Sequence, residues 1–180
     1  MRARHGAHDV ICPRDGMGFG ARLSARGQSC GDPYGQEMEA RTTAGGLDPA
    51  SVNDRVRESF PGSRIECTSL TPTSATARSA PSADDIRPGG FISGPTQFAL
   101  ADAALWYLAF GALGRVELMA LTSELSIRYL RPAIGDVLHA RAELASVSRR
   151  SVVGSVSVWV GDNEHRPSAV AQGTYALPLT

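Results

Sequence analysis

Residues 87–102 read RPGGFISGPTQFALAD, and this stretch decides the architecture. Gly94 and Pro95 open a run with few polar residues; proline suits the first turn of a helix, and glycine lets a ligand approach the backbone. The apolar run continues to about Leu113, and a helix that is apolar almost all round is a buried helix. The stretch therefore predicts a glycine-rich entry into a buried helix that carries one carboxylate, Asp102.

The segment before this helix predicts one short helix and two strands. Asp48 followed by Pro49 is a helix-start signal, and Val52, Val56 and Phe60 recur four residues apart, which places them on one helical face. The predicted elements are a helix from Pro49 to Phe60 that Pro61-Gly62 ends, strands over 64–70 and 73–79 joined by a Thr71-Pro72 turn, and a polar loop over 82–90.

The segment after the helix predicts four strands, over 118–130, 137–147, 151–160 and 169–177. Apolar and polar residues alternate along them, which is typical of a sheet with one buried face. In the first, the two predicted faces are Leu121, Ser123, Leu125, Ile127 and Tyr129 against Thr122, Glu124, Ser126 and Arg128. The element order predicts an α+β domain in which consecutive strands form a curved antiparallel sheet around one apolar helix.

The domain organisation follows from a change of composition near residue 48. Residues 1–47 are rich in Gly, Arg, Ser and Asp and show no lasting periodicity, so we expect a disordered or mis-called N-terminal extension. Residues 48–180 form the predicted domain, which is long enough to bury a core without metals or disulfides.

Charge and cysteine usage exclude several classes of protein. The formal net charge is zero, which argues against nucleic acid or an anionic membrane as a partner. All basic residues other than histidine are arginine, so Schiff-base and P-loop lysine chemistry are excluded. Cys12, Cys30 and Cys67 have no metal-ligand spacing, and we predict no metal site. With no secretory or membrane-spanning pattern, the expected location is the cytoplasm.

Several motifs in this order resemble the acyl-CoA thioesterases of the PaaI-like type, which have the hot dog fold and belong to the 4-hydroxybenzoyl-CoA thioesterase superfamily. They are RPGG (87–90), SGP (93–95), ALAD (99–102), LTSELSIRYLRPA (121–133), GD (135–136) and VAQGTY (170–175). The resemblance implies a hot dog domain over residues 48–180, an acyl-CoA substrate, and a homodimer with two sites at its interface, often paired into a homotetramer.

The resemblance also implies roles for single residues. Asp102 lies seven residues after Pro95 and matches the family's catalytic carboxylate, and Thr122 matches a residue that helps to hold the attacking water. Two positions depart from the family pattern. Ser93-Gly94-Pro95 stands where His-Gly-Gly is common, and Arg87 stands where an asparagine is expected.

This pattern suits thioester hydrolysis. Burial raises the pKa of a carboxyl group, which makes Asp102 a better general base; attack as a nucleophile through an anhydride is the open alternative, and a purely structural aspartate is a third. The N–H groups around Gly94 and Pro95, with the helix dipole, would hold the oxyanion. Thr122 would orient water, although threonine is also common in strands for packing reasons alone.

The spacing of these groups bears on how the site is assembled. Pro95 and Asp102 are two helical turns apart, which is ~10 Å along the axis. One Asp102 therefore cannot reach an acyl group at the start of its own helix. Two antiparallel copies of the helix would bring each aspartate beside the other's N-terminus, which predicts a site shared between two subunits.

The remaining candidates concern substrate binding. Arginine binds phosphate in forked geometry, but a solvated strand end is the alternative for each arginine in this set. The candidates for binding substrate or coenzyme A are Ser93, Gly90, Arg131, Arg149 and Arg150. His139 and His165 are predicted to be surface residues, while Trp106, Tyr107 and Phe110 either line an acyl pocket or pack in the core.

The predicted function is therefore hydrolysis of a small or medium acyl- or aryl-CoA to the free acid and coenzyme A. No separate cofactor is expected, because coenzyme A is part of the substrate. The rival from another class is a non-catalytic acyl-CoA-binding hot dog protein. A hot dog dehydratase is less favoured, since the resemblance implies a histidine where Ser93 stands.

Overall fold

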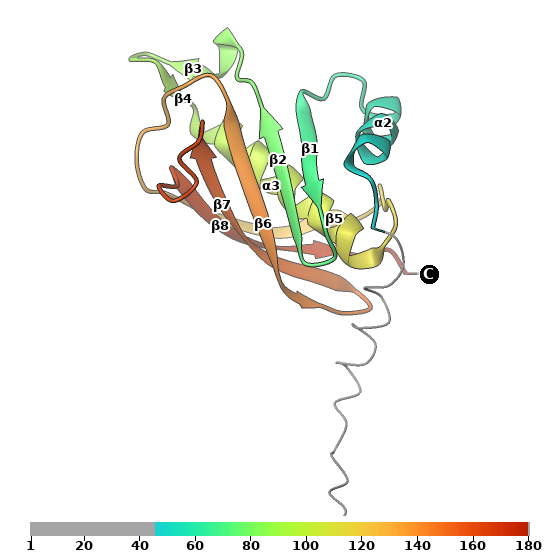
Figure 1. The fold of residues 1–180 in the computed structure, drawn as a ribbon. Coiled ribbons are helices and arrows are strands. Elements are labelled where there is room, and N and C mark those ends of the chain that lie inside the picture. Colours follow the sequence, from blue (N-terminus) through green and yellow to red (C-terminus); the bar gives the residue numbers. More distant parts are fainter. Residues whose placement is uncertain (1–45, 180) are drawn as a thin grey trace, which may run out of the picture. The chain divides into compact units, whose positions relative to one another are not determined.

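The computed structural model describes residues 46–179, which form two α-helices, a short 3-10 helix and eight strands (Figure 1). The predicted extension lies almost entirely outside the described residues, as do Cys12 and Cys30. The elements are α2 (Pro49–Ser59), β1 (Ile65–Leu70), β2 (Ser74–Ser79), η1 (Ala83–Asp85), β3 (Ile86–Arg87), β4 (Phe91–Ile92), α3 (Gly94–Leu113), β5 (Leu121–Tyr129), β6 (Leu138–Val147), β7 (Ser151–Val160) and β8 (Ala169–Ala176).

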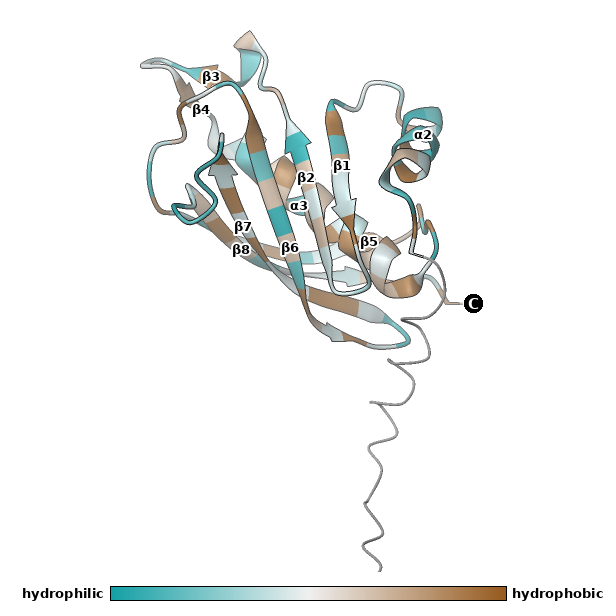
Figure 2. Ribbon diagram, in the orientation of Figure 1, coloured by the Kyte–Doolittle hydropathy of each residue, from teal (hydrophilic) through white to brown (hydrophobic). Residues whose placement is uncertain are grey.

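Six strands form one sheet in the order β1-β2-β6-β7-β8-β5, and every neighbouring pair is antiparallel. The sheet curves around α3, and α2 lies beyond β1 (Figure 1). The α+β architecture with an antiparallel sheet around one helix is thus confirmed. Side chains alternate in hydropathy along β6 (Figure 2), as expected when one face of a sheet packs on a helix and the other faces outward.

The prediction that the last four strands follow one another in the sheet is wrong for β5. This strand pairs with β8 at the sheet edge, because both sides of β6 are occupied by β2 and β7. The segment after β5 therefore crosses from the edge to the middle of the sheet instead of making a hairpin turn. At the start of that segment, the N–H groups of Leu130 and Arg131 donate to the carbonyl of Ser168, just before β8.

α2 begins as predicted and ends one residue early. The Asp48 carboxylate accepts a hydrogen bond from the Ser51 N–H at 3.1 Å, which caps the first turn. Val52 and Val56 are buried, but Phe60 lies beyond the last turn and is 50% exposed. The expected three-residue apolar face is therefore a two-residue face followed by a partly exposed ring.

α3 is the centre of the core, but it is not buried all round. Its sheet-facing side includes Leu100, Leu105 and Leu108, which are at most 1% exposed. The opposite side carries a row of residues that the rest of the described chain does not fully cover, which we call the open stripe: Pro95, Phe98, Ala99, Asp102, Ala103 and Trp106. The expectation of burial on every side is wrong, because one sheet can cover only one side of a helix.

Candidate active site

Asp102 lies on the open stripe of α3, and one of its carboxylate oxygens is fixed by two hydroxyl groups. Its Oδ1 accepts hydrogen bonds from Thr122 Oγ1 at 2.7 Å and from Tyr175 Oη at 2.8 Å. Within residues 46–179, no group donates a hydrogen bond to Oδ2. The side chain is half-buried rather than buried. The carboxylate is therefore held in one orientation with a free oxygen directed away from its anchors.

Thr122 reaches Asp102 because of a β-bulge. The register between β5 and β8 shifts between Thr122 and Glu124, which leaves Ser123 as an extra residue. A bulge re-aims the side chains on either side of it. Strict alternation would place Thr122 on the face opposite to Leu125, but the bulge brings both to the face that packs on α3. The sequence predicted Thr122 as a site residue, whereas its strand pattern predicted the wrong face.

Tyr175 is a site residue that the sequence analysis missed. It is only 4% exposed, and burial raises the pKa of its hydroxyl far above the usual tyrosine range, so it stays protonated and donates to Asp102. The same hydroxyl is also 3.1 Å from the backbone carbonyl oxygen of Asp102. The alternation in β8 places Tyr175 on the inner face with Ala171, but that pattern gives no sign that its hydroxyl reaches the acid.

The start of α3 leaves one backbone donor free. Ser93 is the N-cap: its Oγ accepts from the Thr96 N–H at 3.3 Å, and its carbonyl accepts from the Gln97 N–H at 3.2 Å. Pro95 has no N–H, so it cannot contribute a hydrogen bond to an oxyanion. Gly94 is therefore the residue of the predicted pair whose N–H, aided by the helix dipole, is available to a ligand.

Asp85 anchors the start of α3 to the preceding loop. Its Oδ1 accepts from Thr96 Oγ1 at 3.0 Å, and its Oδ2 accepts from the hydroxyl and the N–H of Ser82, each at 2.7 Å. Arg64 adds an ion pair at 3.0 Å. The hydrogen bonds from Ser82, more than any other contact, hold the pKa of this carboxyl well below its usual range. The predicted polar loop is thus a structured segment.

The RPGG motif forms the turn of the β3–β4 hairpin, which the sequence analysis did not expect. The Gly90 N–H donates to the Arg87 carbonyl at 3.1 Å, and Gly89 and Gly90 have φ of 92° and 78°, in the left-handed region that favours glycine. Gly90 is exposed, and so is Arg87. The structure therefore gives these residues a role in the turn, and the role of Gly90 in substrate binding stays a prediction.

Tyr129 packs directly on Gly94 from the far end of β5. Its hydroxyl donates to the Gly94 carbonyl at 2.8 Å, and a methyl group at Gly94 would lie 3.1 Å from the tyrosine ring and hydroxyl. Glycine is favoured here because a side chain would push the strand away from the helix. This contact ties the free N–H at the start of α3 to the end of β5.

The two halves of the candidate site lie apart in one chain. Gly94 and Asp102 are separated by ~12 Å along the axis of α3. Thr122 and Tyr129, which contact them, lie toward opposite ends of β5. One protomer therefore does not bring Gly94 and Asp102 together.

The three predicted arginines fall into two groups. Arg131 lies beside the start of β8, where its Nη1 donates to the Pro167 carbonyl at 2.9 Å. Arg149 and Arg150 form the β6–β7 turn, and the Arg150 carbonyl accepts from the Leu177 N–H just after β8. The length of β8 therefore separates the two groups by roughly 25–30 Å within one protomer.

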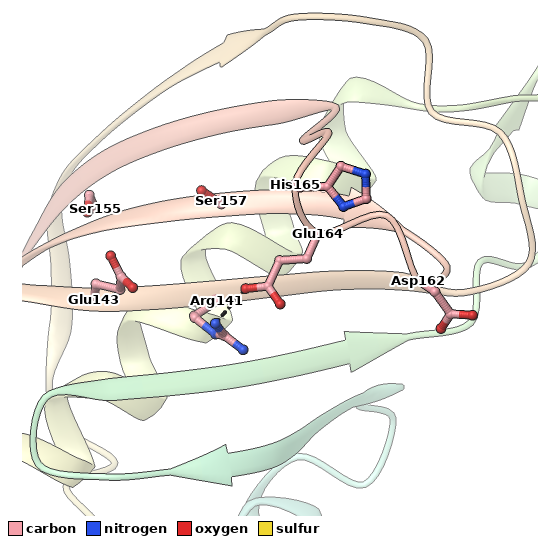
Figure 3. A pocket seen from close by; sticks show the side chains of 7 residues that line it. All are labelled: Arg141, Glu143, Ser155, Ser157, Asp162, Glu164 and His165. Carbon is pink, nitrogen blue, oxygen red and sulfur yellow. Dashed lines mark ion pairs between the residues drawn. The ribbon is translucent and has the colours of Figure 1, made fainter.

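The two histidines among the described residues, His139 and His165, lie away from Asp102. His139 stacks on Trp159 with ring centroids 5.5 Å apart, and burial lowers the pKa of its imidazole. It is half-buried, so the prediction of a simple surface residue holds only for His165, which is exposed. His165 lines a pocket of about 640 Å³ on the sheet face opposite to α3, together with an Arg141–Glu164 ion pair (Figure 3).

Of the three aromatic residues predicted for an acyl pocket or the core, Tyr107 and Phe110 are buried in the core, whereas Trp106 is half-buried. Over residues 46–179, no group of three or more His, Cys, Asp or Glu side chains is placed to hold a metal ion. None of the helices described is long and apolar enough to cross a membrane.

Comparison with known proteins shows which family the chain is similar to. Residues 89–165 match the sequence model of the thioesterase superfamily. A protein from Silicibacter sp., proposed to be a thioesterase, is 29% identical with a TM-score of 0.65, over 74% of this chain and 93% of that one. Over residues 89–165 the chain is thus similar to the thioesterase superfamily, and it has the hot dog fold.

More distant structures share the fold. The phenylacetic acid degradation protein PaaI from Thermus thermophilus is 24% identical with a TM-score of 0.54, over 69% of this chain and 100% of that one. A thioesterase from Haemophilus influenzae is 16% identical with a TM-score of 0.62, over 73% of this chain and 91% of that one. No protein with a curated description matches the chain significantly.

Proposed function

We propose that this protein is an acyl-CoA thioesterase that hydrolyses a small or medium acyl- or aryl-CoA to the free acid and coenzyme A. The observation that carries the proposal is the arrangement of Asp102 on the open stripe: two hydroxyl donors hold Oδ1, while Oδ2 has no hydrogen-bond partner in residues 46–179. For a purely structural aspartate on the open stripe, we would not expect a buried tyrosine and a bulged strand to fix the orientation of the carboxylate.

In the proposed reaction, Oδ2 of Asp102 removes a proton from water as the water oxygen attacks the thioester carbon. The carbonyl oxygen takes up negative charge, which the Gly94 N–H at a helix N-terminus stabilises. The tetrahedral intermediate then collapses, the carbon–sulfur bond breaks, and the thiolate of coenzyme A takes the proton. Thr122 and Tyr175 are positioning residues in this scheme, because they contact Asp102 rather than the substrate.

The same oxygen could attack the carbon itself and form an anhydride that water then hydrolyses. Single-turnover hydrolysis in ¹⁸O-labelled water tests for the anhydride. Label in the carboxylate of Asp102 identifies the anhydride route, because the general-base route delivers label only to the product acid.

A dimer is the second part of the proposal, because the two half-sites are too far apart in one chain. β5 is an edge strand, and an edge presents unpaired N–H and C=O groups to another strand. Large apolar side chains are exposed along and beside this edge, including Met119 (66%), Leu121 (63%) and Tyr129 (50%). A cluster of this kind marks a surface that a partner covers.

Antiparallel pairing of two β5 strands would assemble the site. A two-fold axis near Leu125 and Ser126 places Thr122 of one copy opposite Tyr129 of the other, since these residues lie symmetrically about that point. Asp102, held by Thr122, would then lie near Gly94 of the second copy, which Tyr129 contacts. Each dimer would carry two such sites, and two dimers would pair into the tetramer that the resemblance implies.

The same pairing would bring the separated arginines to one site. Arg149 and Arg150 lie near the end of β8 that carries Tyr175, whereas Arg131 lies near the start of α3. In the antiparallel dimer, Arg131 of the second copy approaches the first copy's Arg150. We propose that these arginines bind the phosphate groups of coenzyme A by forked hydrogen bonds.

Thiol release from a panel of short, medium and aryl-CoA thioesters tests the proposal. We expect hydrolysis by the wild type and a fall of kcat by at least ~100-fold in Asp102→Asn, which keeps the shape but lacks the base. Asp54→Asn, an exposed change on α2, is the control. Full activity of Asp102→Asn would remove Asp102 from the mechanism. Saturable binding of acyl-CoA without hydrolysis of any thioester would favour a non-catalytic binding protein instead.

A further inference from the structure

An apolar pocket of about 440 Å³ opens between α2, β1 and α3, and the proposed chemistry does not use it. Its size lies within the usual range for small-molecule sites. The residues that matter for its shape come from three segments: Val56 and Phe60 from α2 and its end, Ser63 from the turn before β1, and Ala103, Trp106 and Tyr107 from α3.

The walls of the pocket are aromatic. Phe60 and Trp106 meet edge to face with ring centroids 5.7 Å apart, and the Tyr107 ring lies 6.0 Å from Trp106. Phe60 is 50% exposed and Trp106 is half-buried, so residues 46–179 do not fully cover either ring. Partly covered aromatic rings at a concave surface are typical of a site that binds an apolar group.

The two side-chain hydroxyl groups of the pocket are already engaged. The Tyr107 hydroxyl donates to the Ile65 carbonyl at 3.3 Å, and the Ser63 hydroxyl makes hydrogen bonds to the backbone of Ile65. Burial raises the pKa of Tyr107 to about 12, so its hydroxyl stays neutral. No charged side chain is among the lining residues. The pocket therefore favours an apolar group without charge.

The pocket is continuous with Asp102 along the open stripe. Ala103 follows Asp102 directly, and Trp106 lies one turn further, at ~6 Å along the helix axis. A thioester whose carbonyl carbon lies at Asp102 Oδ2 can therefore extend its acyl group over Ala103 and place its end against Trp106 and Phe60.

We propose that this pocket binds the acyl group of the substrate, which identifies the substrate class as uncharged, apolar acyl groups of medium length or with an aryl ring. Phe60, Ser63 and Trp106 are then specificity-determining residues. This inference rests on the proposed thioesterase activity, because the orientation of the acyl group is set by attack from Asp102. Val56 and Phe60 bring α2 and its end to the pocket, so this helix helps to determine which acyl groups fit.

The test compares acetyl-, octanoyl- and phenylacetyl-CoA as substrates of the full chain and of two matched variants. Ser63→Phe places a ring in the pocket at an exposed turn, and Ser155→Phe makes the same change on the outer face of β7. We expect the wild type to prefer octanoyl- or phenylacetyl-CoA over acetyl-CoA by at least ~10-fold in kcat/KM, the scale on which apolar pockets discriminate. Ser63→Phe should abolish this preference and keep acetyl-CoA hydrolysis, whereas Ser155→Phe should keep both.

An unchanged preference in a folded Ser63→Phe would overturn the acyl pocket and leave the thioesterase proposal standing. Phe60→Ala is the second variant: it enlarges the mouth and should shift the preference to longer chains, and no shift would also count against the pocket. If the wild type hydrolyses no thioester, the proposed function fails. The pocket is then judged by the emission of Trp106 in a Trp159→Phe background. The pocket is supported if octanoyl-CoA, but not coenzyme A, changes the Trp106 emission and if this change is lost in Ser63→Phe. Unchanged Trp106 emission on adding octanoyl-CoA refutes the pocket.

Discussion

Replacing Thr122 by valine removes one of the two hydroxyl donors to Asp102 and changes little else. Valine has nearly the same shape as threonine and suits a strand. The lost hydrogen bond is 2.7 Å long and ends on a carboxylate, and bonds to charged groups contribute ~1.5–3 kcal/mol. At ~1.4 kcal/mol for each tenfold change of rate, the full loss would lower kcat by roughly 10- to 100-fold. Because Tyr175 still holds Oδ1, we expect a value near 10-fold.

The assay is thiol release from octanoyl-CoA, with the melting temperature measured on the same samples. Since Thr122 contacts Asp102 and not the substrate in our proposal, KM should change little while kcat falls. Thr122→Ser keeps the hydroxyl and should restore most of the rate. Unaltered kcat in Thr122→Val, or a failure of serine to restore it at an unchanged melting temperature, would refute the positioning role.

Three further predictions concern assembly and stability. Leu121→Lys places a charge on the exposed β5 edge and should convert the dimer to a monomer, measured by light scattering, that has no thioesterase activity. An active monomer would refute the shared site. Burial raises the pKa of the Cys67 thiol from 9.0 to about 11, so the stability that the neutral thiol contributes is present below pH 9 and is lost as the pH rises toward 11. Chemical denaturation should therefore show the unfolding free energy of the wild type falling by about 2 kcal/mol relative to that of Cys67→Ala over this range. A constant difference between the two unfolding free energies would contradict this prediction. A methyl group at Gly111 would collide with the Thr71 carbonyl oxygen, so Gly111→Ala should lower the unfolding free energy by about 1–3 kcal/mol. Gly62→Ala is the control and should have little effect, because Gly62 has open space around it. Equal unfolding free energies of the two variants would show that the helix can move away from Thr71.

Much of the fold could be predicted from the sequence because its signals are local. The continuous apolar run after Gly94-Pro95 gave the central helix nearly to the residue, since burial and helix-start chemistry act within a few turns. The six strands of the large sheet were predicted from their composition and alternation to within about three residues, but β3 and β4 were not. Strand order is set by contacts between segments far apart in the chain, which is why the placement of β5 beside β8 was not predicted.

The candidate site divides in the same way. Asp102 stands out in the sequence as an acid inside an apolar run, so its position could be inferred. Its two donors could not both be inferred. A bulge turns Thr122 inward, and bulges depend on the pairing of two strands rather than on one. Tyr175 looks like any aromatic residue in an alternating strand until the fold brings its hydroxyl to the carboxylate.

The pairing of β5 with β8 has a consequence for the order in which the protein folds. The acid and its two anchors lie far apart in the sequence, with 20 residues from Asp102 to Thr122 and 73 from Asp102 to Tyr175. Contacts between distant segments form slowly, because a long loop must close before they contribute. As the chain leaves the ribosome, α3 and β5 emerge before β8, and β5 has no neighbour in the sheet until β8 has been synthesised. The Asp102 carboxylate thus gains its fixed orientation only in the final stage of folding. A nascent chain that ends before β8 contains Asp102 but lacks Tyr175, which orients it.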